Sequence, residues 1–339
     1  MSPGDLAVPV VQAPMAGGPS TPALAAAVSG AGGLGFVAIA YLAPDAAAAR
    51  IAEVRALTGA PFGVNLFCPP SGAAAPAAVD AYRRVVEPLA AAHGVALGAP
   101  RVDDDGWEAK LDLLVEHRPA VVSFAFGCPD GAVVERLRAA GIAVWVTVTD
   151  AREAALAAAA GADALVAQGA EAGGHRGSFE DRDDPPQPLD ELLPAVRAAG
   201  GGAPVVAAGG LMDGGAIAAA LGAGAAAAQL GTAFLLCPEA GTSPVHRAAV
   251  AGSAPTTITR AFTGRRARGV VNAWTEGIGR DAPSAYPEIH HLTAPLRAHG
   301  RARGEADLVS LWAGVGHARA RPIPAAELVA ELAREIAAA

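Results

Sequence analysis

Residues 164–177 read Ala164-Leu165-Val166-Ala167 followed by Gln168-Gly169-Ala170-Glu171-Ala172-Gly173-Gly174-His175-Arg176-Gly177. The first four residues form an apolar run that is typical of a buried strand. The loop after them supplies an amide and paired glycines that let a backbone approach a ligand closely. It also holds a histidine, which can exchange a proton or pair with an anion near neutral pH. A strand that ends in such a loop is typical of a (β/α)8 barrel, whose chemistry lies at the carboxyl ends of its strands.

The rest of the chain repeats this order of a short apolar run, a loop and an Ala/Leu-rich helical stretch. Near-continuous apolar runs are typical of strands buried on both faces of a parallel sheet. Eight of them predict an α/β fold of the TIM-barrel type, with an open doubly wound sheet as the alternative because strand order cannot be read from sequence. The predicted strands cover residues 8–13, 34–39, 62–66, 120–124, 143–148, 164–167, 204–208 and 226–231, and the predicted helices cover residues 21–29, 44–58, 131–140, 151–160, 190–199 and 213–221.

Two intervals are longer than a plain strand–helix unit. Residues 67–119 are predicted to hold extra helices near 77–92 and 107–116. Residues 240–319, rich in Pro, Gly, His and Arg, are predicted to form a mainly helical accessory segment, or lid, inserted after the eighth strand. Residues 324–336 have the apolar periodicity of an amphipathic helix that supplies the last barrel helix. The predicted barrel therefore comprises residues 1–239 and 320–339.

The composition narrows the class of protein. The chain is 52% hydrophobic and 17% charged, with a formal net charge of −8 and no basic block, so nucleic-acid binding is not expected. Its three cysteines lie outside any CxxC pair, and the sequence predicts no metal site. An odd cysteine count without a signal peptide predicts a cytoplasmic protein, and no apolar run is long enough to predict a membrane span. The oligomeric state is left open.

Two glycine clusters follow the last two predicted strands, Ala207-Ala208-Gly209-Gly210 and Gln229-Leu230-Gly231-Thr232. In barrels, the loops after strands seven and eight often bind phosphate through free backbone N–H groups. Either cluster alone reads as a tight turn or helix cap. The pair in this register favours a phosphate site.

These motifs, in this order, resemble the nitronate monooxygenase family, formerly called 2-nitropropane dioxygenases. The resemblance also rests on segments outside the glycine clusters and spans nearly the whole chain. Those segments are Ala13-Pro14-Met15-Ala16-Gly17-Gly18, Phe62-Gly63-Val64-Asn65-Leu66, the loop 168–177, His291-Leu292-Thr293-Ala294-Pro295-Leu296-Arg297 and Leu311-Trp312-Ala313-Gly314. One departure is Val315, where the resemblance leads us to expect Gln, so the contribution of the accessory segment to the pocket is left open.

The resemblance implies an FMN-dependent oxygenase that converts anionic alkyl nitronates, such as propionate 3-nitronate, with O2 to a carbonyl compound and nitrite. By match to the family motifs, His175 is the active-site histidine, which binds the nitronate or removes an α-proton from a neutral nitroalkane. The other matched residues are expected at the cofactor. They are Gly209, Gly210, Gly231 and Thr232 at the phosphate with Gln229 nearby, Pro14, Met15, Asn65 and Gln168 at the ring or ribityl chain, and Gly173 and Gly174 against the flavin.

For several residues, a purely structural role is an alternative to a functional one. Arg176 is expected to pair with Glu180 or Asp181 at the surface, and Asn65 is as well placed to cap a turn as to bind a ligand. The cysteines are expected to be small buried hydrophobes rather than nucleophiles. The acidic runs 103–105 and 181–184 are expected to be solvated loops, and the roles of Tyr286, His290 and His291 are left open.

Two other functions remain open on sequence alone. The same barrel and glycine pattern resembles FMN-dependent NAD(P)H:quinone reductases and enoyl-thioester reductases, which accept hydride from a nicotinamide. A non-enzymatic flavin-binding protein is the second alternative.

Overall fold

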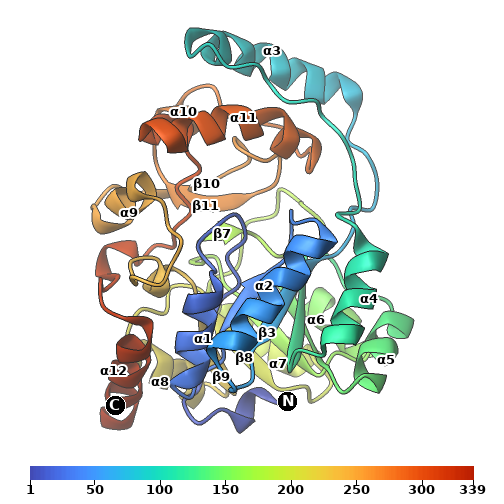
Figure 1. Cartoon of the computed structure of the whole chain (residues 1–339), viewed down its shortest axis with the longest axis vertical. Coiled ribbons are helices and arrows are strands. Elements are labelled where there is room, and N and C mark those ends of the chain that lie inside the picture. The colour runs from blue at the N-terminus through green and yellow to red at the C-terminus, as the bar shows by residue number, and fades with distance from the viewer.

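The computed structural model describes all 339 residues and contains eight parallel strands in the order β1-β9-β8-β6-β5-β4-β3-β2 (Figure 1). The two ends of this order meet, because Val11 of β1 forms a parallel bridge with Leu34, two residues before β2. The sheet is therefore a barrel; the predicted TIM barrel is confirmed and the open sheet was wrong. The strands are β1 Val10–Gln12, β2 Phe36–Ala38, β3 Gly63–Phe67, β4 Val121–Ala125, β5 Ala143–Val148, β6 Ala164–Gln168, β8 Val205–Ala208 and β9 Ala227–Leu230.

The barrel helices begin where short polar side chains follow the strands. Side-chain oxygens of Thr21, Asp130, Asp150 and Asp213 accept hydrogen bonds from the first turns of α1, α5, α6 and α8. The helices around the barrel are α1 Pro22–Gly30, α2 Pro44–Leu57, α4 Trp107–His117, α5 Gly131–Ala139, α6 Ala151–Ala159, α7 Leu189–Ala199, α8 Gly214–Gly222 and α12 Ala325–Ala338. The last of these packs against α1 and α8, so it completes the ring after the long insertion, as predicted.

Alternate strand residues fill the inside of the barrel. Phe36 and Trp145 are both fully buried there, with their ring centroids 5.9 Å apart. Because side chains alternate across a strand, the next inward positions toward the carboxyl ends are Thr147, Gln168 and Gln229. The apolar core of the barrel thus ends in a polar layer at its mouth.

A second layer covers that mouth (Figure 1). Its sheet has the order β10-β11-β7, built from β7 Gly174–His175, β10 Thr256–Thr259 and β11 Ala267–Val270. A separate hydrophobic cluster packs α3 Pro76–Ala92 against α10 Ala273–Glu276 and α11 Glu288–Arg303. The helix α9 Pro244–Ala251 lies at the level of β10 and β11, where its Val250 packs with Val270 of β11 (Figure 1). The two extra helices predicted within 67–119 are therefore present as α3 and α4. The division at residue 240 stays a prediction, and the packing adds α3 to the second layer.

None of the helices combines the length and the apolar character needed to cross a membrane.

Candidate active site

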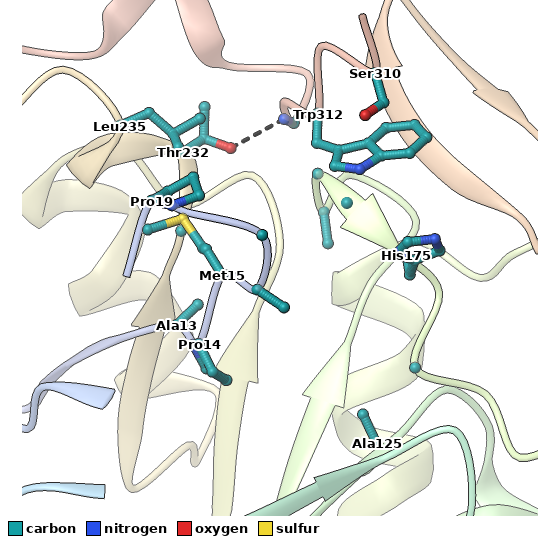
Figure 2. A pocket seen from close by; sticks show the side chains of 18 of the residues that line it. Ala13, Pro14, Met15, Pro19, Ala125, His175, Thr232, Leu235, Ser310 and Trp312 are labelled. Atoms are coloured by element: carbon teal, nitrogen blue, oxygen red, sulfur yellow. Dashed lines mark hydrogen bonds between the residues drawn. The ribbon is translucent and has the colours of Figure 1, made fainter. Parts of the chain in front are cut away.

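A cavity of about 390 Å³ lies at the carboxyl ends of the barrel strands, between the barrel and the second layer (Figure 2). Its volume is in the range of ordinary small-molecule and cofactor sites. Every residue that the sequence singled out for catalysis or cofactor binding lines it. These residues are Pro14, Met15, Asn65, Gln168, Gly173, Gly174, His175, Gly209, Gly210, Gln229, Gly231 and Thr232. The structure thus brings the whole predicted set together, and the role of each member stays a prediction.

Gln168, the last residue of β6, fixes the loop that carries the histidine. Its Nε2 donates to the carbonyl of His175 at 3.0 Å, and its Oε1 accepts from the N–H of Gly177 at 2.8 Å. The loop then enters β7, where His175 pairs with Ala267 of β11. The histidine is therefore held from the barrel on one side and from the accessory segment on the other.

His175 is partly buried among aromatic rings and hydrogen-bonded through one nitrogen. Its Nε2 lies 2.8 Å from Thr263 Oγ1, and its ring centroid is 5.4 Å from that of Trp312 and 5.6 Å from that of Phe126. Burial, assisted by the charges of two nearby arginines, lowers the pKa of His175 to about 3. The imidazole is therefore neutral at neutral pH, and it can contact an anion as a hydrogen-bond donor but not as a cation. The hydroxyl of Thr263 can donate or accept, so it is compatible with either tautomer.

A buried positive charge at the cavity comes from Arg297 on α11, a residue to which sequence reasoning gave no role. Its side chain is buried, with Nε donating to Thr293 Oγ1 at 3.1 Å and Nη2 donating to the carbonyl of His290 at 2.8 Å. None of its hydrogen bonds goes to a carboxylate, and Nη1 makes none within the protein. Burial lowers the pKa of Arg297 to about 10, which leaves it a cation at neutral pH. Its signal in the sequence is its place at the end of the 291–297 motif.

Aromatic side chains form a roof beside this arginine. Tyr41 stacks on His290 with ring centroids 4.3 Å apart, and its hydroxyl lies 3.0 Å from that of Tyr286. His290 lines the cavity, and the ring centroid of Tyr286 is 6.1 Å from that of His175. By contrast, His291 does not line the cavity, and its Nε2 lies 3.2 Å from a carboxylate oxygen of Asp103. Of the three residues left open, only His290 lines the cavity, whereas Tyr286 contacts the site through Tyr41 and His175. Tyr41, which also lines the cavity, was missed.

The two glycine clusters form a cup at the ends of β8 and β9. The backbone N–H groups of Gly209, Gly210, Gly231 and Thr232 make no hydrogen bond within the protein, although all four residues line the cavity. Gly209 and Gly210 have φ angles of 119° and 71°, a left-handed backbone that favours glycine. Convergent, unpartnered N–H groups of this kind bind anions such as phosphate.

The remaining polar groups at the mouth are available to a ligand. The Nδ2 of Asn65 donates to the carbonyl and to the hydroxyl of Ser123, both at 3.0 Å, which leaves its Oδ1 without a partner. The side chain of Gln229 makes no hydrogen bond within the protein and lines the cavity. Figure 2 shows Thr232 on the opposite side of the cavity from His175, with its hydroxyl accepting from the N–H of Gly314 at 3.0 Å. Asn65 is thus a buried strand residue with a free acceptor and not the cap of a turn.

Comparison with known proteins agrees with this geometry. The model of the nitronate monooxygenase family matches residues 4–335. The chain belongs to this family. It is 47% identical to the nitronate monooxygenase of Pseudomonas aeruginosa, over 97% of this chain and 96% of that protein. A nitroalkane oxidase from Streptomyces ansochromogenes has a TM-score of 0.95 and 49% identity, covering 98% of this chain and 96% of its own.

A more distant likeness is to FabK from Thermotoga maritima, with a TM-score of 0.77 and 25% identity over 98% of this chain and 94% of that one. Because the higher identities belong to a nitronate monooxygenase and a nitroalkane oxidase, the comparisons favour the monooxygenase prediction over the reductase alternative. This nitronate monooxygenase family member is an enzyme of the oxidoreductase class.

Two surface expectations for this family member were wrong. Arg176 is buried, and its Nη1 donates to the carbonyl of Gly169 at 2.6 Å, so it supports the histidine loop from within. Asp181 is also removed from solvent, with a side-chain exposure of 7%, and pairs with Arg260 at 2.7 Å and Arg266 at 3.1 Å. These contacts join the loop after β7 to the accessory segment, and no local sequence pattern could have revealed them.

The acidic run at 103–105 is also partly structural. Asp105 accepts from the N–H of Tyr41 and lies 2.7 Å from Nζ of Lys110, a lysine that is fully buried. The residue Tyr41 has a φ of 65°, so this contact stabilises the left-handed turn that presents the tyrosine to the roof. Asp105 therefore acts on the site indirectly, through the position of Tyr41.

The cysteines of this family member have the surroundings expected of small buried side chains rather than of nucleophiles. Cys68 and Cys237 are buried, and Cys128 is partly buried with its thiol donating to the carbonyl of Pro129. Burial raises the pKa of all three thiols, to about 11 for Cys128, which keeps them protonated at neutral pH.

Val315, where the family resemblance led us to expect Gln, does not form part of the cavity wall. Its neighbours Trp312 and Gly314 line the cavity, whereas Val315 is half exposed and does not. The accessory segment therefore contributes to the site through Trp312, Thr263 and Arg297.

Proposed function

We propose that this protein binds FMN at the mouth of the barrel and oxidises alkyl nitronates with O2 to a carbonyl compound and nitrite. One observation carries the proposal: a single cavity holds two separate anion-binding elements on different walls. The first is the cup of unpartnered N–H groups at β8 and β9, and the second is Arg297 beside the neutral His175. A flavin mononucleotide needs the first for its phosphate, and a nitronate needs the second.

The residues of the cavity fit FMN in chemistry and in space. A Cβ atom added at Gly209 would lie 3.2 Å from the backbone N of Ala172, and one added at Gly210 would lie 3.0 Å from the side chain of Glu171. Side chains at these two positions would therefore press against the loop 169–172, which packs on the cup. Asn65 and Gln229 offer an acceptor and an unpartnered amide for the polar edge of the ring. When bound, FMN would supply the one-electron redox chemistry that no side chain of the protein provides.

The protein's own part is to attract, orient and enclose the substrate. Arg297 supplies a buried positive charge, which favours an anionic nitronate over a neutral nitroalkane. With Thr263 donating to its Nε2, His175 would carry a proton on Nδ1 and donate to a nitronate oxygen. Its low pKa makes it a weak base at neutral pH, which argues against α-proton abstraction as its main task. The aromatic roof of Tyr41, Tyr286 and His290 would exclude water.

The redox state of the cysteines indicates the cellular compartment in which the enzyme works. Three free cysteines without a disulfide are typical of a reducing compartment, so we propose that the enzyme works in the cytoplasm, on small nitronates and dissolved O2.

The direct test is to purify the protein, identify any released yellow cofactor by mass, and measure nitrite formation and O2 consumption with propionate 3-nitronate. We expect FMN and O2-dependent nitrite release without a nicotinamide. A protein that cannot be loaded with FMN, or that holds FMN and releases no nitrite, would contradict the proposal. In the second case the non-enzymatic flavin-binding alternative would stand.

A further inference from the structure

We propose that His93, His299 and Glu305 bind a divalent metal ion, with Zn²⁺ as the preferred one, at a site outside the active-site cavity. One ligand atom from each of these side chains lies within 4.8 Å of the others. The Nδ1 of His93 is already 3.1 Å from Oε2 of Glu305, which is the spacing of two ligands on one zinc ion. None of the three residues lines the cavity, so the site is separate from the proposed oxidation chemistry.

The carboxylate of Glu305 has one buried oxygen, Oε2, that makes no hydrogen bond and has Nδ1 of His93 as a polar neighbour at 3.1 Å. Its Oε1 accepts from Nε of Arg303 at 3.2 Å, whereas its Oε2 is buried and makes no hydrogen bond, despite the nearby histidine nitrogen. A buried carboxylate oxygen without a partner is costly. A cation placed between Oε2 and the two imidazoles would supply the missing interaction.

Backbone hydrogen bonds fix the positions from which the three side chains extend. His93 is the C-cap of α3, and its N–H donates to Ala90. His299 lies in the last turns of α11, and Glu305 follows the left-handed Gly304 that ends that helix, with its N–H donating to Gly300 at 2.9 Å. The backbone of the ligands is therefore ordered before a metal ion binds, which reduces the conformational entropy lost on binding.

The donor set selects the metal. Two imidazole nitrogens and one carboxylate oxygen suit Zn²⁺, whereas Mg²⁺ and Ca²⁺ prefer oxygen ligands throughout. Three protein ligands leave the fourth tetrahedral position to water. Sequence spacing could not reveal the site, because His93 and the other two residues lie far apart in the chain and meet only through packing of α3 on α11.

The position of the proposed metal site indicates what a bound ion would do to the fold. The helix α3 is the outermost element of the second layer and is joined to the barrel only by the segments on either side of it (Figure 1). A metal ion bound by His93 at its end would fix α3 to α11, the helix that carries Arg297. The expected consequence is a more stable second layer, not a change in chemistry.

The test uses the intact protein after treatment with a chelator. Zn²⁺ affinity is measured by calorimetric titration, and Co²⁺ is added as a spectroscopic probe that shows the visible absorption of a tetrahedral site. We expect one equivalent per chain, a rise in melting temperature with Zn²⁺, and unchanged nitronate turnover. His93→Ala, His299→Ala and Glu305→Gln should each weaken binding by more than the 10- to 100-fold typical of losing an outer-sphere partner.

His117→Ala is the matched control, because this histidine ends α4 on the barrel and belongs to no such cluster. It should bind Zn²⁺ like the wild type. The proposal is overturned if the wild-type protein binds no more Zn²⁺ than the triple variant His93→Ala/His299→Ala/Glu305→Gln, a comparison that does not depend on the single variants folding. It is also overturned if the control loses as much affinity as the ligand variants. A protein that binds zinc but lacks nitronate activity would refute only the proposed function.

Discussion

Replacing Arg297 with Met tests the source of the attraction for an anionic substrate. The guanidinium is buried, is charged at neutral pH and has one nitrogen, Nη1, without a partner in the protein. A hydrogen bond to a charged group contributes about 1.5–3 kcal/mol. Its loss therefore lowers kcat/KM for a nitronate by roughly 10- to 150-fold, at 1.36 kcal/mol per factor of ten. Since methionine replaces the buried stem, we expect the fold to persist.

The assay is steady-state O2 consumption with propionate 3-nitronate at constant ionic strength, together with FMN content and melting temperature. The loss should be mainly in KM, because the interaction is made with the substrate anion itself. Arg301→Met is the matched control: Arg301 lines the same cavity from the next turn of α11 but is exposed, so its loss should cost no more than about fivefold. A kcat/KM for Arg297→Met within twofold of wild type, with FMN bound, would refute the electrostatic role.

Three further predictions concern the histidine, the cup and the loop contacts. The pKa of His175 is about 3 in the folded protein and about 6.5 in the unfolded chain, so the unfolded chain takes up a proton first as the pH falls and the folded state loses stability. The free energy of unfolding of the wild type should therefore fall between pH 7 and pH 5 by about 2 kcal/mol more than that of His175→Asn. The opposite sign would show that the histidine is charged in the folded state. Gly209→Ala forces a side chain into a left-handed backbone. The free variant can relieve ~1–2 kcal/mol of strain by distorting the cup, and FMN binding must restore it, so affinity in a fluorescence titration should fall about tenfold. Gly222→Ala, which meets nothing within 4 Å, should leave the affinity unchanged. Asp181→Asn should lower the free energy of unfolding in urea by about 3–5 kcal/mol, because it breaks a buried ion pair. Asp183→Asn, at an exposed carboxylate, should lower it by less than about 1 kcal/mol. Equal effects of the two substitutions would show that the ion pairs of Asp181 stabilise the fold no more than the exposed pair of Asp183.

The barrel and the residues at its mouth could be predicted because both depend on short, local sequence patterns. Apolar runs such as residues 143–148 mark buried strands, and parallel strands bring their carboxyl ends to one place. Once the strand count was known, Gly209 and Gly231 had to lie beside each other, and the loop carrying His175 had to face them.

The second layer could not be predicted in the same way. The strand β7 has two residues, and its partner β11 comes from the accessory segment, so neither shows a periodic pattern. The helix α3 was predicted as a helix, but its packing on α11 depends on contacts between distant parts of the chain. Arg297, Tyr41 and the burial of Asp181 follow from that long-range packing, which is why sequence reasoning missed their place at the site or assigned them to the surface.

The most direct test of the central claim is an anaerobic absorbance measurement on the protein loaded with FMN. The protein is mixed in separate experiments with propionate 3-nitronate, NADH and NADPH, and the visible flavin absorbance is followed in a stopped-flow instrument. We expect rapid bleaching by the nitronate, little or none by either nicotinamide, and return of the absorbance when O2 is admitted. Rapid bleaching by NADH or NADPH with no response to the nitronate would contradict nitronate oxidation as the function and support a reductase.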